Sequence, residues 1–498
     1  MSNLSELLPA GAGAKSASFV ASGTLGSGVT VALKADGKVE AVAETTISQN
    51  IPIVNATTFA NQATEYNQVK ADPHNANRWA AVWTDDVGTK YVRVAIFTRS
   101  GSSITVSPIS NAFTGGNASE PAICFDPNTA GKFLLTFNNT NNDFSAIVGT
   151  FSGTAGSETF SYGSSLTVDT GWQQQRPVLT PTGTSGDFIN LARNASNFGY
   201  QEARILRVSG TTVSAPGSTV VLNSASGEVQ YAANPTNSDE GIALFTIHND
   251  TLRGRVINIS GTGITVSSET VLDSGNNYGS DYCPCRITQI NSSNYLIAAR
   301  DASADRLYSM VLTNSSGTLT TNTRVLVSSA TTGAISYYDI NNNLSEPSTF
   351  AASFRDRINN VAYCTVGTLS GTTITINTNV ALGAANTNLK FYYSVAQQSG
   401  VTGSFLLVGG DASRIAQYVL GETGGTSTNS ANFIGITDQA IADTATGAVI
   451  VQGGVSEKVT GLTTGSDYYV QSNGTLSTTV SSVPAGRALS STSILLEG

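Results

Sequence analysis

The chain has 498 residues, too many for a single ordinary hydrophobic core, so two or more compact units are expected. Only 12% of the residues are charged, the formal net charge is −9, and the 25 Lys and Arg residues are scattered along the sequence. This pattern argues against a nucleic-acid partner or an anionic membrane surface. No apolar stretch reaches about 18 residues, so no membrane insertion is expected.

The first 45 residues differ from the rest of the chain. Residues 1–15 lack the basic and apolar regions of a secretory signal, which predicts retention in the cytoplasm until release, and they suit a mobile arm or docking peptide. Residues 17–44 alternate apolar and polar side chains around a "DGK" turn, which is typical of β-strands.

An internal repeat follows. Seven apolar runs, from "WAAVW" to "FLLVG", begin at residues 79, 133, 188, 242, 295, 350 and 405, so successive starts lie 53 to 55 residues apart. Four prolines that suit a turn before these runs are spaced by 54 residues: Pro73, Pro127, Pro181 and Pro235. Each run is followed by a residue that suits a hairpin turn, in the series Asp85, Asn139, Asn194, His248, Asp301, Asp356 and Asp411.

Each repeat unit contains four predicted strands, for example "PAICF", "KFLLTF", "SAIVGTF" and "SSLTV". A period near 54 with four antiparallel strands is typical of a propeller blade, whereas tandem sandwiches need nearer 90–100 residues per repeat. Trp79 and Trp83 face the same way on one strand, and we expect them to pack between blades.

The seventh unit lacks a fourth strand after "RIAQYVL" (414–420), and a spare strand-like segment precedes the first unit. We expect the segment 46–56 to complete the seventh unit and close the ring. The fold prediction is therefore all-β: a seven-bladed β-propeller over 46–422, closed by an N-terminal strand. The flanks 1–45 and 423–498 are each too short for a core, so together they are predicted to form one small β domain.

The flanks also carry a resemblance. The stretches "LLPAGAGAKSASFVASGTLGSGVTVALKADGKVEAV", "NFIGITDQAIADTATGAVIVQGGV" and "GLTTGSDYYVQSNGTLSTT" are similar to segments of bacteriophage virion structural proteins, in particular tail-fibre-like proteins of marine and cyanobacterial phages. The resemblance implies a non-enzymatic virion component that mediates attachment or host recognition, contacts other virion proteins through the flanks and forms a homo-oligomer. It leaves open a tail fibre or a capsid decoration protein.

A carbohydrate-binding, lectin-like propeller is the main alternative. The starts of the predicted first strands place carboxylates, amides and aromatic rings around the mouth of the central channel, and sugars are bound by such groups. The same residues also suit a water-filled channel with capped strand ends. The candidate ligand- or receptor-binding residues are Glu65, Tyr66, Glu120, Trp172, Gln174, Glu228, Asp281, Tyr282, Tyr337 and Tyr392.

A glycoside hydrolase or lyase is a further alternative, with Glu120, Glu228 and Asp281 as acids and Arg176 as a cation. No sialidase-type Asp box is present, and the two histidines lie in predicted turns, so no catalytic residue is predicted. Cys283 and Cys285 flank a proline, but no matching ligand pair lies nearby. We therefore predict buried free thiols, no metal site and no cofactor.

Overall fold

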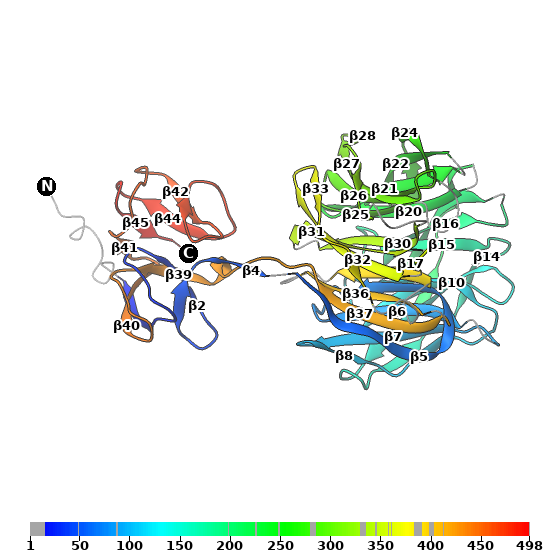
Figure 1. Ribbon diagram of the computed structural model, residues 1–498, viewed down its shortest axis with the longest axis horizontal. Helices are drawn as coiled ribbons and strands as arrows, with labels where there is room; N and C mark the ends of the chain where they lie inside the picture. Colours follow the sequence, from blue (N-terminus) through cyan, green and yellow to red (C-terminus); the bar gives the residue numbers. More distant parts are fainter. Residues whose placement is uncertain are drawn as a thin grey trace. The chain divides into compact units, whose positions relative to one another are not determined.

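The computed structural model describes residues 15–47, 49–85, 88–197, 199–224, 227–247, 250–278, 285–328, 335–343, 346–356, 358–359, 361–382, 391–397, 403–411 and 413–497. This part of the chain is all-β, and its only helical segment is a short 3-10 helix, η1 (Ser430–Asn432). The chain divides into two compact units (Figure 1). The larger covers residues 48–425, and the smaller is built from the described residues before and after that range.

Five sheets of the larger unit contain five strands each. The first has β10 (Ser119–Phe125), β11 (Lys132–Asn138), β12 (Phe144–Ser152), β13 (Thr159–Tyr162) and β14 (Leu166–Asp169). The second has β15 (Gln174–Pro181), β16 (Asp187–Asn194), β17 (Tyr200–Ser209), β18 (Thr212–Ser214) and β19 (Val220–Asn223). The third has β20 (Gly227–Asn234), β21 (Asn237–Ile247), β22 (Asp250–Ser260), β23 (Gly263–Val266) and β24 (Thr270–Tyr278). The fourth has β25 (Cys285–Gln289), β26 (Asn294–Asp301), β27 (Arg306–Ser315), β28 (Thr318–Thr321) and β29 (Val325–Leu326). The fifth has β30 (Ile335–Asn343), β31 (Glu346–Asp356), β32 (Val361–Ser370), β33 (Thr373–Ile376) and β34 (Val380–Ala381).

The first and last repeat units share one sheet of eight strands. Its strands are β35 (Phe391–Gln397), β36 (Ser404–Gly410), β37 (Ile415–Glu422), β5 (Asn50–Ala71), β6 (Arg78–Asp85), β7 (Val92–Ser100), β8 (Ser103–Val106) and β9 (Ser110–Phe113). The long strand β5 pairs with β37 along its first part and with β6 along its second. The predicted pairing of an N-terminal segment with the seventh unit is thus present, but it uses residues 50–63 rather than 46–56.

The repeat unit differs from the predicted four strands. In the first of the five-stranded sheets, β13 and β14 both pair with β12, one along its C-terminal end and the other along its N-terminal end. The fourth position is therefore occupied by two short strands, and the same split recurs in the four sheets that follow and along β7. Short outer strands expose little unpaired backbone at a sheet edge.

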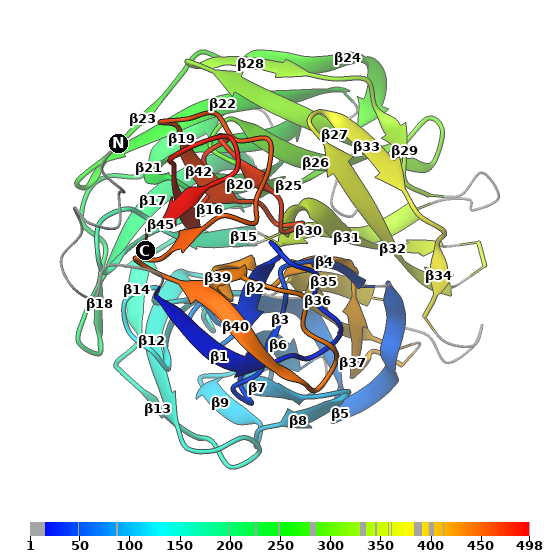
Figure 2. The same ribbon diagram turned by 90° about the vertical axis from the view of Figure 1, so that its left-hand side faces the viewer.

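The sheets of the larger unit lie around a common centre, with the first strand of each sheet innermost (Figure 2). The apolar clusters join neighbouring sheets: Val82 of β6 packs in one cluster with Leu135 of β11, and Leu244 of β21 packs in another with Ile297 of β26. Trp79 and Trp83 are buried, as predicted. The larger unit therefore has an all-β, propeller-like fold.

Several of the predicted turn residues accept a hydrogen bond through the side chain from the backbone N–H two residues further on. Asn139 Oδ1 accepts the N–H of Asn141 at 2.9 Å, Asp301 Oδ1 accepts that of Ser303 at 3.0 Å, and Asp411 shows the same pattern with Ser413. Such Asx turns close a hairpin without any ligand. His248 of the same series lies outside the described residues.

The smaller unit combines strands from both ends of the chain. One sheet, in the order β1-β40-β39-β2-β3, contains β1 (Ser16–Val20), β2 (Thr30–Leu33), β3 (Val39–Ala41), β39 (Phe433–Thr437) and β40 (Thr446–Val451). A second contains β41 (Val455–Ser456), β42 (Asp467–Val470), β43 (Leu476–Ser477), β44 (Pro484–Ala488) and β45 (Ile494–Leu496), and β4 (Glu44–Ile47) pairs with β38 (Gly425–Thr428). Ile436 of the first sheet and Ile494 of the second share one apolar core.

A substitution of Phe59 on β5 tests how much this strand contributes to the stability of the larger unit. Its half-buried ring contacts Trp83 and Phe97 of the first unit at centroid distances of 5.2 and 5.0 Å, and Tyr418 of the last unit at 6.4 Å. We expect Phe59→Ala to lower the free energy of unfolding, measured by urea denaturation, by about 2–3 kcal/mol, since it leaves a partly closed cavity. Val221→Ala on an outer strand, where the side chain is 44% exposed, should change it by less than about 0.5 kcal/mol. Equal effects would show that β5 contributes no more than an outer strand.

Candidate functional site

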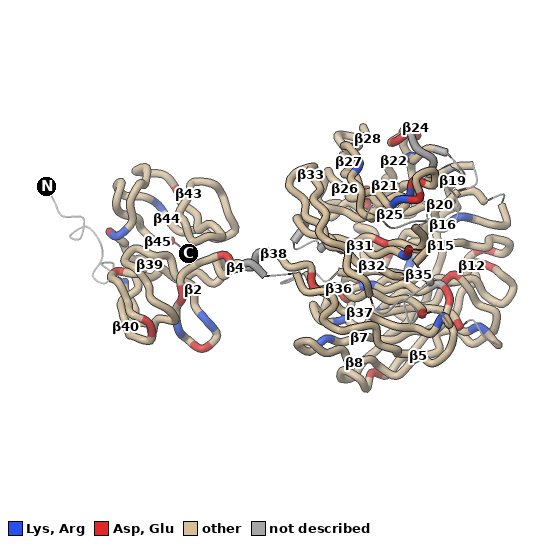
Figure 3. Tube along the Cα trace, viewed as in Figure 1, with Lys and Arg blue, Asp and Glu red and all other residues tan. Residues whose placement is uncertain are grey.

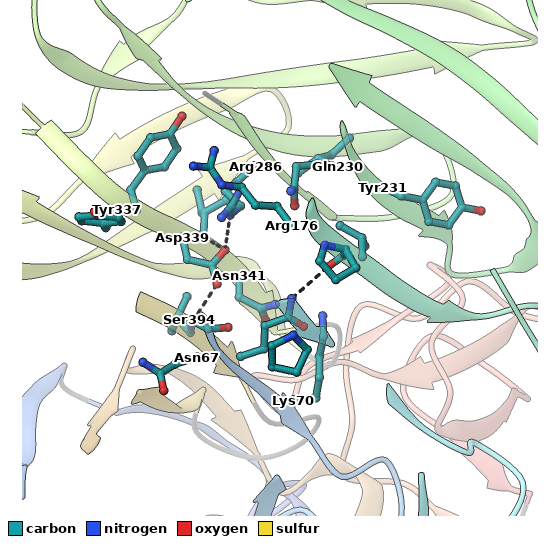
Figure 4. Close-up of a pocket in the computed structure, with 18 of the residues that line it drawn as sticks. Asn67, Lys70, Arg176, Gln230, Tyr231, Arg286, Tyr337, Asp339, Asn341 and Ser394 are labelled. Carbon is teal, nitrogen blue, oxygen red and sulfur yellow. Dashed lines mark hydrogen bonds and ion pairs between the residues drawn. The ribbon is translucent and has the colours of Figure 1, made fainter. Parts of the chain in front are cut away.

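A cavity of about 130 Å³ lies where the innermost strands of the larger unit meet. Its lining residues come from β5, β10, β15, β20, β25, β30 and β35, so every repeat unit contributes to it. Figure 4 shows polar and charged side chains from these strands around the cavity, including Lys70, Arg176, Arg286 and Asp339.

A repeated β-bulge shapes this lining. On β10 the residue paired with the second strand advances from Ser119 to Ala122 while its partner advances by only two positions, so one extra residue is inserted. The same shift occurs on β5, β15, β30 and β35. In three of these bulges the first residue has a positive φ: Glu120 and Arg176 at 49° and Tyr337 at 45°. Such conformations are costly for non-glycine residues, and they cluster at ligand sites.

Side chains also link several of the inner strands to one another. Glu120 Oε2 accepts the backbone N–H of Arg176 at 2.9 Å, and Asp339 Oδ2 accepts that of Val395 at 2.9 Å. Gln68 Nε2 reaches from β5 to the carbonyl oxygen of Pro177 on β15, at 2.9 Å. These bonds hold the cavity wall in one arrangement.

Two clusters of charged side chains dominate the electrostatics of the cavity. Arg176 forms an ion pair with Glu228, and its backbone binds the carboxylate of Glu120. Burial raises the pKa of the Glu120 carboxyl to about 7, and the Arg176 N–H and guanidinium oppose this only in part. Arg286 Nε lies 3.4 Å from Asp339 Oδ1; burial raises the pKa of that carboxyl too, against the opposing charge of Arg286.

Other polar groups that line the cavity have no hydrogen-bond partner among the described residues. Among the described residues, the side chains of Lys70, Gln230 and Ser394 make no hydrogen bond or ion pair. Asn67 is 4% exposed, and within the same part of the chain its Oδ1 accepts no hydrogen bond. Buried polar groups are normally paired, so these atoms are available to a ligand or to water.

The structure brings some of the sequence-predicted site residues to this cavity. Glu120 and Tyr337 line it, and Glu228 contacts it through Arg176. Glu65 instead binds Lys90 and Arg414, each at 3.0 Å. Asp281 and Tyr282 lie outside the described residues, as do the side chains of Tyr66 and Tyr392.

Two of the predicted site residues are placed differently. Trp172 was expected at the channel mouth, but its ring is 2% exposed and packs on Phe144 at a centroid distance of 4.8 Å, because burial of so large an apolar surface is favourable. Gln174 is fully buried, and its backbone and side chain bind Asn138, Asn190 and the carbonyl of Glu120.

Sequence reasoning missed the residues deeper along the inner strands. Gln68, Arg286, Asp339 and Ser394 each pair with the fourth residue of a repeated apolar run, at Val82, Ala298, Ser353 and Val408. The repeat itself could have located these positions, but only with knowledge of the bulges, which shift the register by one residue.

The cysteines and the charged side chains of the described residues add no further candidate site. Cys124, Cys285 and Cys364 are buried, and Cys283 lies outside the described residues. No group of three or more His, Cys, Asp or Glu that could hold a metal ion occurs in the described part of the chain. Positions of both charge signs are interspersed along both units (Figure 3). Within the same residues, no helix is long and apolar enough to cross a membrane.

Comparison with known proteins places the larger unit among propeller-like folds. No protein-family model and no curated protein matches the chain. The BP39L lectin from Burkholderia pseudomallei aligns with a TM-score of 0.55 at 9% identity, over 74% of this chain and 98% of that chain. A lectin from Aleuria aurantia aligns with a TM-score of 0.40 at 12% identity, over 66% and 99%. A putative 6-phosphogluconolactonase from Bacteroides fragilis aligns with a TM-score of 0.46 at 8% identity, over 74% and 98%.

Glu120 provides a test of the buried cavity wall. Its pKa in the folded state, about 7, exceeds the ordinary value of 4.5, so the stability supplied by the protonated carboxyl is complete below pH 4.5 and lost as the pH rises through about 7. The amide of Glu120→Gln does not ionise. We expect the difference in unfolding free energy between the variant and the original chain, measured by denaturant titration, to shift in favour of the variant by about 3 kcal/mol from pH 4.5 to pH 8. If the unfolding free energies of the two proteins changed in parallel with pH, burial would not raise the pKa of Glu120.

Proposed function

We propose that this chain is a non-enzymatic carbohydrate-binding protein whose seven-bladed β-propeller body binds a saccharide in its central cavity. The observation that carries the proposal is a set of polar groups in the cavity that have no protein partner in the described residues, namely Asn67 Oδ1 and the side chains of Lys70, Gln230 and Ser394. Sugar hydroxyls both donate and accept hydrogen bonds, and these side chains offer both capacities. The shared fold with the Burkholderia pseudomallei lectin supports the same reading.

The sequence repeat and the pairing of β5 support the proposal of seven blades. The second part of β5 is the innermost strand of the first unit, and its first part completes the last unit beside β37. In this arrangement each of the seven sequence repeats supplies one blade, and the seven innermost strands meet at the cavity.

The cavity suits one sugar unit. Its volume, about 130 Å³, lies below the roughly 300–1,000 Å³ of pockets that enclose drug-sized ligands. The bonds that hold Arg176 and Asp339 in place leave the wall pre-organised, which limits the entropy lost on binding.

A virion role remains a second proposal, carried by the flanks. The segments that resemble phage structural proteins build a compact unit of their own, with strands from both chain ends in one sheet. We propose that this unit attaches the protein to other virion proteins while the propeller binds a host glycan. None of the three structures compared above is a phage protein, so the support is the resemblance alone. Peptides of this chain in purified particles would support the role, and their absence from particles of the source phage would contradict it.

Gln230 tests the saccharide site. We expect the full chain to bind glycans on an array, and isothermal titration with the best ligand to show a two- to tenfold higher dissociation constant for Gln230→Ala, since one neutral hydrogen bond contributes about 0.5–1.5 kcal/mol. The matched control is Gln452→Ala, an exposed glutamine in the smaller unit, which should bind as the original chain does.

Two results would contradict the proposal. Glycan binding unaffected by Gln230→Ala and by a second cavity variant, Asn67→Ala, would place the site elsewhere. Shortening of a bound oligosaccharide during long incubation would favour the hydrolase alternative, for which a carboxyl with a pKa of about 7, such as Glu120, is a suitable general acid.

A further inference from the structure

The cavity contains three cationic side chains on three different strands. Lys70 lies on β5, Arg176 on β15 and Arg286 on β25, and all three line the cavity (Figure 4). Cations gathered in a partly enclosed site repel one another unless anions lie between them, because the low dielectric strengthens charge interactions. Whether these cations can bind an anionic ligand therefore depends on whether nearby carboxylates already pair with them.

Those carboxylates are already bound by other groups. Asp339 accepts the backbone N–H groups of Ile340 and Val395 and pairs with Arg286. Glu228 pairs with Arg176, and Glu120 accepts the Arg176 N–H. Two of the three cations thus have a carboxylate within contact distance.

Lys70 is the exception. Its ammonium group makes no ion pair with any described residue, although its charge, like that of Arg286, acts on the carboxyl of Asp339. Lys70 therefore acts on the Asp339 carboxylate without forming an ion pair with it, whereas Arg286 does form one. This leaves one cationic group that faces the cavity and can bind an anion from solution.

We propose that the cavity selects an acidic saccharide, a sugar unit bearing a carboxylate, whose anionic group binds Lys70. The inference rests on the saccharide-binding function proposed above and specifies its ligand. Hydroxyl groups of the same sugar would donate to Asn67 Oδ1 and bind the amide of Gln230, both without a partner in the described residues. A neutral sugar would leave the Lys70 ammonium group unpaired in a partly buried site, which is unfavourable.

The test compares ligands first and variants second. Isothermal titration of the full chain at pH 7 would use glucuronate, glucose and acetate at equal ionic strength. We expect glucuronate to bind at least tenfold more tightly than glucose, because a hydrogen bond to a charged group contributes about 1.5–3 kcal/mol. Acetate should bind more weakly than glucuronate, because it lacks the hydroxyl groups.

Variants of Lys70 test whether its ammonium group binds the carboxylate of the sugar. Lys70→Met keeps the length of the side chain, and we expect it to lose most of the preference for glucuronate over glucose. Lys70→Arg keeps the charge and should retain the preference. Lys38→Met is the matched control: it removes the same charge from an exposed side chain of the smaller unit and should leave binding unchanged.

Each contrary result has a distinct meaning. Equal affinity for glucose and glucuronate would overturn the acidic-ligand inference and leave the saccharide function standing. Equal affinity for acetate and glucuronate would show a simple anion site and overturn the saccharide ligand. Full preference for glucuronate in a folded Lys70→Met variant would place the anion elsewhere. If the full chain bound glycans on the array but neither glucuronate nor glucose at the same concentrations, only the acidic-ligand inference would be overturned. If the full chain bound no glycan at all, both proposals would be overturned.

Discussion

The pairing of β5 on both of its parts is the constraint on which the larger unit depends. In this chain of repeats, the last repeat lacks an outer strand, and a strand that belongs to no sheet precedes the first repeat. Unpaired backbone groups would be unfavourable in both places. A single strand of 22 residues resolves both by pairing first with β37 and then with β6. Phe59 adds an apolar contact to the same connection, because its ring lies against aromatic residues of the first and last units.

The cavity is a consequence of that arrangement. When the innermost strands of all the units face a common centre, their side chains meet in a partly enclosed space that is rich in polar groups. Burial of so many polar groups is unfavourable unless they bind one another, and most do, through the bonds of Glu120, Asp339 and Gln68 to neighbouring strands. The few groups left over, namely an ammonium group, an amide oxygen, an amide and a hydroxyl, are those that we propose bind the ligand.

Much of the architecture could be predicted from sequence because it depends on local patterns. Apolar runs spaced by 53 to 55 residues identified the repeat, and the Asp and Asn series identified turns that the structure shows, as at Asn139 and Asp301. The common sheet of the two flanks could be inferred because neither is long enough for a core alone. The split fourth strand could not, since four-residue strands such as β13 and β14 have too few positions for a periodic signal.

The site was harder to predict than the fold. The first residues of the inner strands were the sequence candidates, and Glu120 and Tyr337 do line the cavity. Lys70 and Asp339 lie deeper, beyond bulges that no pattern of residue types reveals, and Trp172 is drawn into the apolar core. Register and burial are tertiary properties, so sequence alone places such residues on a strand without saying what they face.

The most direct test of the account is a crystal structure of the full chain with bound glucuronate. The account predicts the ligand in the central cavity, with its carboxylate against the ammonium group of Lys70 and its hydroxyls against Asn67 and Gln230. A bound ligand between the sheets or on the smaller unit, with the central cavity occupied only by water, would contradict it.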